Sequence, residues 1–269
     1  MSQTESRTQY LQRPDGRIAY DVAGAGPLVV AVPGMGDSRT SYRFLAPALV
    51  AAGYRVATMD LRGHGESDTS FTTFDDEAAA SDVAALVDEL GGPATLVGNS
   101  MGAAAATIVA ADRPELVEHL VLIGPFVRDL PTPPGTRLAL RVALLRPWGP
   151  AVWRRFHRRL FPSHPPTDYD EYSDALMSSL SRPGAWRAFQ RTARTSHEPA
   201  ARRLSGVHSP TLVVMGTADP DFKDPVGEAE LVAGRLHGGS FLVPGSGHYP
   251  QAEFPDLVAN GIVEFLAQG

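Results

Sequence analysis

The sequence predicts an α/β fold in which a mainly parallel sheet carries helices on both faces and a helical insertion interrupts the alternation. The chain has 269 residues, a length that suits one large domain or one core with an insertion. Hydrophobic residues make up 43% and charged residues 20%, as is typical of globular proteins. Short apolar runs alternate with amphipathic segments, which favours parallel strands joined by crossover helices.

The first half of the chain contains a predicted hairpin and then regular strand–helix units. A Pro-Asp-Gly turn separates the hairpin strands 8–11 and 17–22. The continuous apolar run Leu28–Val32 predicts a strand buried on both faces. Strands and helices then alternate: we expect a helix over 41–52, a strand over 55–59, a helix over 75–90, a strand over 94–97, a helix over 101–112 and a strand over 119–123.

The alternation breaks between about residues 126 and 205. Prolines separate helical stretches there, among them 135–145 and 151–160. The regular pattern then resumes, with a strand over 211–215, a helix over 225–236, a strand over 240–243 and a helix over 255–266. We therefore expect a core domain formed by residues 1–125 and 206–269, and a helical cap formed by residues 126–205.

The charge of the expected cap differs from that of the whole chain. The chain has a net charge of −6, which argues against a general affinity for nucleic acid. Segment 126–205 nevertheless holds fourteen arginines and six acidic residues. One interpretation is a basic lid that attracts anionic substrates, and the other is a set of arginine-rich helices that pair with an acidic core and present solvated faces.

Several classes of protein are excluded or disfavoured by composition. The absence of cysteine excludes disulfides, thiolate metal sites and thiol catalysis. No apolar run is long enough to predict a membrane-spanning helix, and the first seventeen residues lack the apolar core of a signal peptide, so we expect a cytoplasmic protein without stable membrane insertion. No clustered-histidine or phosphate-loop motif is present, and we expect neither a metal nor an organic cofactor.

The segment with the most specific chemical signal is Gly98-Asn99-Ser100-Met101-Gly102. It lies between the predicted strand 94–97 and the predicted helix 101–112. This is the context of a nucleophile elbow, in which a strained turn projects a serine hydroxyl above the sheet and the flanking glycines avoid collisions. We interpret Ser100 as the nucleophile; the alternative is a plain turn in which the serine caps the helix.

A serine hydroxyl is a poor nucleophile until a base takes its proton, and His248 is the predicted base. It lies in a glycine-containing loop between the last predicted strand and the last predicted helix. The main alternative is His64, in a glycine-rich loop after strand 55–59. The other histidines are interpreted as surface or core positions.

The imidazole of the base needs a carboxylate that fixes its tautomer, and Asp219 is the predicted partner. It follows strand 211–215 by one short turn. Asp221 and Asp224 are close enough in sequence to compete for the role. The order serine, aspartate, histidine along the chain is the one expected for a hydrolase of this architecture.

A carbonyl under attack develops a negative oxygen, which needs preorganised donors. We expect the backbone N–H groups of Met101 and Met35 to supply them, with Gly34 allowing the backbone to approach the substrate closely. In the insertion, Phe126 and Trp153 are candidates to line an apolar substrate chamber. The alternative for such aromatic residues is a small helical core.

These motifs resemble the α/β-hydrolase superfamily, and the resemblance covers nearly the whole chain. Ser100, Asp219 and His248 match its triad positions, and the turn 33–36 resembles its oxyanion turn. Many members have His-Gly where this chain has Pro33-Gly34, but the donor is a backbone N–H. The resemblance implies the α/β-hydrolase fold, with a helical cap inserted into the core.

The resemblance also implies a serine hydrolase that cleaves carboxylic esters of small or medium, largely apolar substrates through an acyl-enzyme. Thioester or C–C bond hydrolysis, lactone hydrolysis and cofactor-free haloperoxidase or perhydrolase activity are alternatives on the same site. A ligand-binding protein without hydrolytic activity is a further alternative. The expected partner is a small-molecule ester and not a nucleic acid, and assembly into a homo-oligomer stays open.

Overall fold

The computed structural model describes residues 8–131 and 133–268 of the chain. The expected core range therefore begins with seven residues outside this description, Thr132 of the expected cap lies outside it, and so does Gly269. Within the described ranges, the strands form a single eight-stranded sheet in the order β1-β2-β4-β3-β5-β6-β7-β8. The strands are β1 (Gln9–Arg13), β2 (Gly16–Ala23), β3 (Leu28–Val32), β4 (Arg55–Met59), β5 (Ala94–Asn99), β6 (Val117–Ile123), β7 (Thr211–Gly216) and β8 (Gly239–Val243).

The sheet is mainly parallel, as predicted. Strands β1 and β2 form an antiparallel hairpin, and β2 also pairs antiparallel with β4. All pairings from β4 through β8 are parallel. Every residue of β3 and β5 is buried, because helices cover both faces at the centre of the sheet.

Two hydrophobic clusters fill the space between the sheet and its helices. One lies under α2 (Asp76–Glu89), α3 (Met101–Asp112) and α9 (Pro225–Arg235), and the other lies under α1 (Leu45–Ala51) and α11 (Pro255–Leu266). This arrangement confirms the predicted layers of helix, sheet and helix. The short elements are η1 (Arg39–Tyr42), η2 (Pro114–Leu116), η3 (Leu204–Gly206) and α10 (Pro250–Glu253).

One predicted helix is divided in the structure. The sequence predicts a helix over 41–52, whereas the chain forms the 3₁₀ helix η1 and then the separate helix α1, which begins at Leu45. Pro47 lies in the first turn of α1, where its missing N–H costs no intrahelical hydrogen bond. The same proline further into a continuous helix would remove such a bond, so the helix starts just before it.

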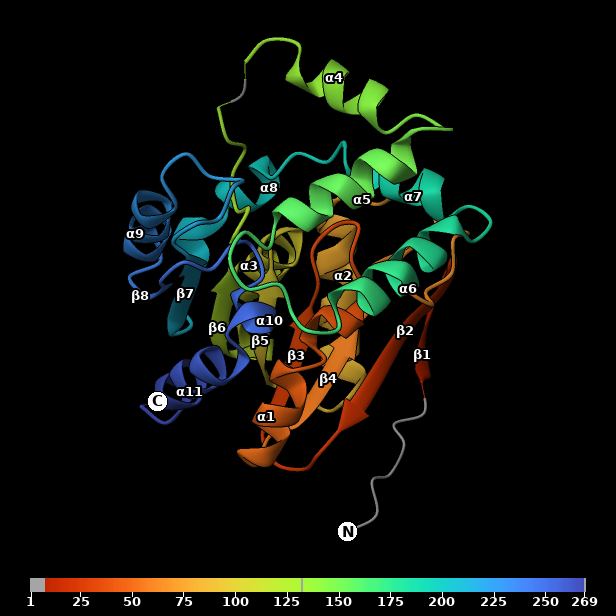
Figure 1. Ribbon diagram of the computed structural model, residues 1–269. Coiled ribbons are helices and arrows are strands. Elements are labelled where there is room, and N and C mark those ends of the chain that lie inside the picture. The colour runs from red at the N-terminus through yellow and green to blue at the C-terminus, as the bar shows by residue number, and fades with distance from the viewer. Residues whose placement is uncertain (1–7, 132, 269) are drawn as a thin grey trace.

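The segment between β6 and β7 forms helices that lie at one end of the sheet, with α4 farthest from it (Figure 1). These helices have a hydrophobic cluster of their own, which includes Trp153, Trp186 and Phe189. The division into core and cap domains stays a prediction. No helix of the described residues is long and apolar enough to cross a membrane. The helices of this segment are α4 (Thr136–Ala143), α5 (Gly149–Arg159), α6 (Tyr169–Ser181), α7 (Ala185–Thr192) and α8 (Glu198–Ala201).

Candidate active site

Ser100 lies in a strained turn between β5 and α3. Its φ of 57° and ψ of −120° place it in a region that residues with a side chain rarely occupy. Its side chain makes no capping hydrogen bond to α3, so the alternative of a helix-capping serine is wrong. The backbone N–H of Ser100 donates to the carbonyl of Ile123 at 2.9 Å, which ties the turn to the end of β6. The hydroxyl therefore lies at the carboxyl end of β5 and is not used to cap the helix.

The glycines on either side of Ser100 are required by close backbone contacts. A Cβ atom on Gly98 would lie 2.4 Å from the carbonyl oxygen of Gly102, and one on Gly102 would lie 2.2 Å from the carbonyl oxygen of Val32. Both distances are far below van der Waals contact, and the neighbouring atoms are backbone atoms that cannot move easily. The strained turn therefore depends on both glycines of the motif.

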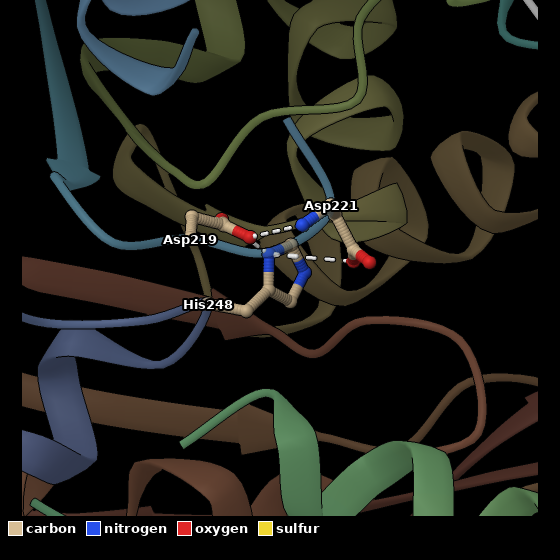
Figure 2. Close-up of side chains that lie close together, drawn as sticks. All are labelled: Asp219, Asp221 and His248. Carbon is tan, nitrogen blue, oxygen red and sulfur yellow. Dashed lines mark hydrogen bonds and ion pairs between the residues drawn. The ribbon is translucent and has the colours of Figure 1, made fainter. Parts of the chain in front are cut away.

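His248 and Asp219 are brought together from two loops that follow neighbouring strands. Nδ1 of His248 lies 2.7 Å from Oδ2 of Asp219, and both side chains are buried. Asp219 follows β7, and the loop that holds His248 follows β8 (Figure 2). The side-chain amide of Asn99 donates to the carbonyl of His248 at 3.2 Å, which ties this loop to the residue preceding Ser100.

The charge of Asp219 determines the protonation of His248. Burial lowers the pKa of the imidazole, but the negative charge of Asp219 and the hydrogen bond to it outweigh burial and raise the pKa of His248 to about 9. The hydrogen bond at Nδ1 also fixes the ring orientation. Among the hydrogen bonds of the described residues, none involves Nε2 of His248, which leaves this nitrogen for proton transfer.

Asp221 lies at the edge of the same group. Its Oδ2 is 3.8 Å from Nδ1 of His248, and its backbone N–H donates to Oδ1 of Asp219 at 3.0 Å (Figure 2). Burial raises the pKa of Asp221 to about 6. The third candidate, Asp224, instead accepts a hydrogen bond from Gly227 N–H and caps the N-terminus of α9. Geometry therefore favours Asp219 as the partner of the histidine, with Asp221 as a second carboxylate nearby.

Asp219, Asp221 and His248 offer ligand atoms within 4.8 Å of one another, a spacing that a metal ion could also occupy. The 2.7 Å contact between Nδ1 and the Asp219 carboxylate is, however, the length of a charge-assisted hydrogen bond. A proton shared by this pair accounts for the arrangement. The absence of a metal stays an expectation from the sequence.

His64, the alternative base, is placed differently. It is fully buried, its Nδ1 lies 2.8 Å from the carbonyl oxygen of Arg62, and burial lowers its pKa to about 4. Its ring packs edge-on against Phe189. It does not belong to the lining of the cavity at Ser100, so its place agrees with a structural role in the loop after β4.

A cavity of about 470 Å³ lies between the sheet and the helices of the insertion. Ser100 and His248 both line it, as do Met35 and Met101, whose N–H groups are the expected oxyanion donors. Met101 is the first residue of α3, where N–H groups have no acceptor within the helix. The apolar part of the lining includes Phe126, Leu130, Leu140, Ala143, Leu144, Val152, Trp153, Phe156, Leu160 and Tyr249.

Of the three residues expected to contact substrate, two line the cavity and one does not. Phe126 and Trp153 line the cavity, and Trp153 also belongs to the hydrophobic cluster of the insertion. Gly34 does not belong to the lining; a Cβ atom on it would lie 2.9 Å from the Cβ atom of Ser100. Its small size therefore lets the turn that carries Met35 pack directly against Ser100.

A buried polar cluster connects this turn to the insertion. The carboxylate of Asp37, two residues after Met35, accepts a hydrogen bond from the Tyr172 hydroxyl of α6 and lies 3.9 Å from Nε2 of His157 in α5. Burial opposes ionisation of Asp37, yet His157 and Tyr172 hold its pKa below the ordinary value. This cluster is not predictable from the sequence, because Asp37 is more than a hundred residues from both His157 and Tyr172 and no local motif marks the three.

The sequence predicts a surface or core position for His197, whereas the structure places it in the lining of the cavity. Its Nδ1 lies 2.8 Å from Oδ2 of Asp76, which is fully buried at the start of α2. The pair is separated by 121 positions, so no spacing in the sequence could have revealed it.

Comparisons with known proteins agree with the fold described above. A sequence profile described as the alpha/beta hydrolase family matches residues 29–260. The putative non-heme bromoperoxidase BpoC of Mycobacterium tuberculosis is 31% identical, with 93% of this chain and 97% of the relative covered. The sn-1-specific diacylglycerol lipase ABHD11 of Mus musculus is 27% identical, with 90% and 81% covered. The solved structure of a thermophilic esterase from Thermogutta terrifontis has a TM-score of 0.81 at 25% identity, with 98% and 99% covered.

Proposed function

Since this chain belongs to the alpha/beta hydrolase family, we propose that it is a serine hydrolase that cleaves carboxylic esters through Ser100, His248 and Asp219. The observation that carries the proposal is the uncapped, strained Ser100 on the wall of a cavity that it shares with a histidine hydrogen-bonded to a buried carboxylate. A strained residue of this kind persists only where the surrounding structure enforces it. The lining, which is mostly apolar, supports a largely apolar acyl or alcohol group in the substrate.

The reaction has two halves. Nε2 of His248 takes the proton of the Ser100 hydroxyl while Oγ attacks the ester carbonyl. The N–H groups of Met35 and Met101 stabilise the tetrahedral oxyanion, and the ester C–O bond then breaks as the alcohol leaves with the proton from His248. Water, deprotonated by the same histidine, attacks the acyl-enzyme and releases the acid. Asp219 holds the imidazole in position and stabilises its positive charge in both halves.

The test is covalent labelling with a fluorophosphonate followed by mapping of the modified residue. Ser100 should be labelled, and p-nitrophenyl esters of increasing acyl length should be hydrolysed. Ser100→Ala should abolish both results, while the exposed Ser240→Ala serves as a matched control that leaves them unchanged. Labelling at another serine, or undiminished turnover by Ser100→Ala, would refute the assignment of the nucleophile.

The relative BpoC, named as a putative non-heme bromoperoxidase, favours perhydrolysis as a second candidate activity. In that reaction hydrogen peroxide replaces water as the group that attacks the acyl-enzyme, and the product is a peracid that oxidises bromide. The discriminating measurement is bromination of monochlorodimedone in the presence of peroxide, bromide and acetate. Ester hydrolysis at a higher kcat/KM than peracid formation supports the first candidate.

A further inference from the structure

The cavity has a second histidine that the proposed triad does not use. The side chain of His197 is anchored by the buried Asp76, and its backbone N–H donates to Oδ1 of Asp129 at 2.8 Å. Ring and backbone are therefore fixed by separate carboxylates from different parts of the chain. Two anchors on one partly buried loop residue that lines the cavity indicate that its ring is held for contact with a ligand.

Phe126 contacts both imidazoles of the cavity. The centroid of its ring is 5.9 Å from that of His248 and 5.6 Å from that of His197. The two histidines thus share one aromatic neighbour in the lining of the same cavity, and His197 offers a polar position separate from His248. A substrate chain that runs along Phe126 from Ser100 would bring its far end to His197.

The atom of His197 that is available to a ligand is Nε2. Nδ1 is engaged by Asp76, and within the described part of the chain no hydrogen bond involves Nε2. A second polar atom of the lining, two positions earlier in the chain, supports this. The Oγ1 atom of Thr195, another residue of the lining, is buried and has no hydrogen-bond partner among the described residues. A buried hydroxyl without a partner is costly, and a ligand atom would satisfy it.

The charges around His197 determine which ligand group fits. The carboxylates of Asp76 and Asp129 both lie next to His197. Among the described residues that line the cavity, Arg137 supplies the one guanidinium group. Its side chain is largely exposed and lies 3.1 Å from the carboxylate of Asp129. An anionic group placed at Nε2 would meet an excess of negative charge. A neutral hydroxyl would instead donate to Nε2 and accept from Thr195.

We propose that His197 and Thr195 form a subsite for a hydroxyl group carried by the substrate chain at a distance from the ester carbonyl. The inference rests on the proposed ester hydrolysis, since it assigns the class of ester: one with an apolar chain and a hydroxyl at its far end. His197 contacts the substrate, and Asp76 acts through it as a positioning residue.

The experiment compares p-nitrophenyl hexanoate, its 6-hydroxy analogue and the matching monoester of adipic acid. In the unmodified protein the hydroxy ester should have a kcat/KM about 3- to 10-fold above that of the plain ester, as one hydrogen bond allows. His197→Phe keeps a ring but removes both nitrogens, so the ratio of the two kcat/KM values, hydroxy ester over plain ester, should fall to about 1 whatever the absolute rates of the variant. Asp76→Asn should weaken the preference, with hydrolysis of the plain ester reporting that the variant folds.

Binding is measured separately from catalysis. In Ser100→Ala, 6-hydroxyhexananilide should bind more tightly than hexananilide, and His197→Phe in this background should remove the difference. This binding measurement still tests the subsite if no ester is hydrolysed. Absence of hydrolysis would refute the proposed function but not the subsite. Equal treatment of the plain and hydroxy compounds, a preference that survives His197→Phe, or a preference for the adipate ester would overturn the subsite.

Discussion

His248 lies closer to Asp219 than to any other carboxylate of the described chain, with 2.7 Å between Nδ1 and Oδ2. Asp221 is the next nearest, with 3.8 Å between its Oδ2 and Nδ1 of His248. This distance is too long for a hydrogen bond, so Asp221 does not orient the ring. The two acids therefore differ in what they do for the imidazole. Asp219 fixes the tautomer and stabilises the charge, whereas Asp221 acts on it only through space.

The first prediction separates these two acids. Asp219→Asn should lower kcat/KM on p-nitrophenyl esters by about 10⁴-fold, since an amide at this position favours the wrong tautomer. Asp221→Asn should cost less than about 10-fold, because the hydrogen bond at Nδ1 remains. Steady-state kinetics of both variants is the measurement. A larger loss in Asp221→Asn than in Asp219→Asn would reverse the assignment.

The second prediction concerns the dependence of activity on pH. The pKa of His248 is raised from 6.5 to about 9, so the free imidazole that acts as base forms only as the pH approaches 9. We expect kcat/KM to rise about tenfold per pH unit below that value and to level off above it. Asp221→Asn removes a negative charge that stabilises the imidazolium, so the midpoint should move to lower pH. A midpoint at or below 6.5 in the unmodified protein would contradict the electrostatic account.

The third prediction concerns stability near the site. Burial raises the pKa of Asp221 from 3.8 to about 6, so the folded state holds this proton more tightly than the unfolded state. The stabilising contribution is full below pH 3.8 and is lost as the pH rises through 6. At pH 8 the ionised group is a net cost, and Asp221→Asn should raise the free energy of unfolding by on the order of 1 kcal/mol. Urea denaturation at pH 8 tests this; a less stable variant would show that the charge contributes favourably.

The fourth prediction concerns the strained turn. Gly102→Ala places a Cβ atom 2.2 Å from the carbonyl oxygen of Val32, so β3 or the start of α3 must shift and Ser100 with it. We expect a loss of kcat of about 100-fold or more, by analogy with displacements of about 1 Å at other active sites. Gly234→Ala is the matched control: it lies in α9 with no atom near its Cβ position, and it should stabilise the protein by about 0.5–1 kcal/mol without affecting kcat. Thermal unfolding and ester kinetics of the pair are compared.

The fifth prediction concerns the polar cluster behind the oxyanion turn. Tyr172→Phe removes a hydrogen bond to the buried carboxylate of Asp37 and should destabilise the fold by about 1–3 kcal/mol. It should also lower kcat more than it raises KM, because Asp37 lies two residues from Met35. Tyr169→Phe, on the same helix, loses its contact with His157 but none with the turn, and should leave kcat unchanged. Equal effects of the two variants on kcat would show that the cluster serves only stability.

The sequence predicts much of this structure because the relevant signals are local. The apolar run Leu28–Val32 and the motif around Ser100 follow from side chains that are adjacent along the chain, and the structure places them as expected. His248 is predictable for a similar reason, since its loop follows the last strand. The continuous helix predicted over 41–52 is wrong, because Pro47 favours a helix that starts just before it. This proline is also a local signal.

Contacts made across the fold are not predictable in this way. Asp76 reaches His197, and Asp37 reaches Tyr172, only after the insertion has packed against the sheet. A histidine that faces a cavity and one that faces the core share the same neighbours in sequence. The aromatic residues show the same limit: Phe126 and Trp153 line the cavity, whereas Trp186 fills the core of the insertion.

The hydrogen bond from Tyr172 to Asp37 has a consequence for protein engineering. The insertion and the turn expected to hold the oxyanion donors are joined through this one cluster, with Asp37 on the side of the turn and His157 and Tyr172 on the side of the insertion. A chimaera that carries the insertion of a homologue would lose the side chains that contact Asp37. We therefore expect a chimaera built to broaden substrate scope to have a lower kcat as well. Libraries that randomise Asp37 together with positions 157 and 172 would let selectivity change while the rate is kept.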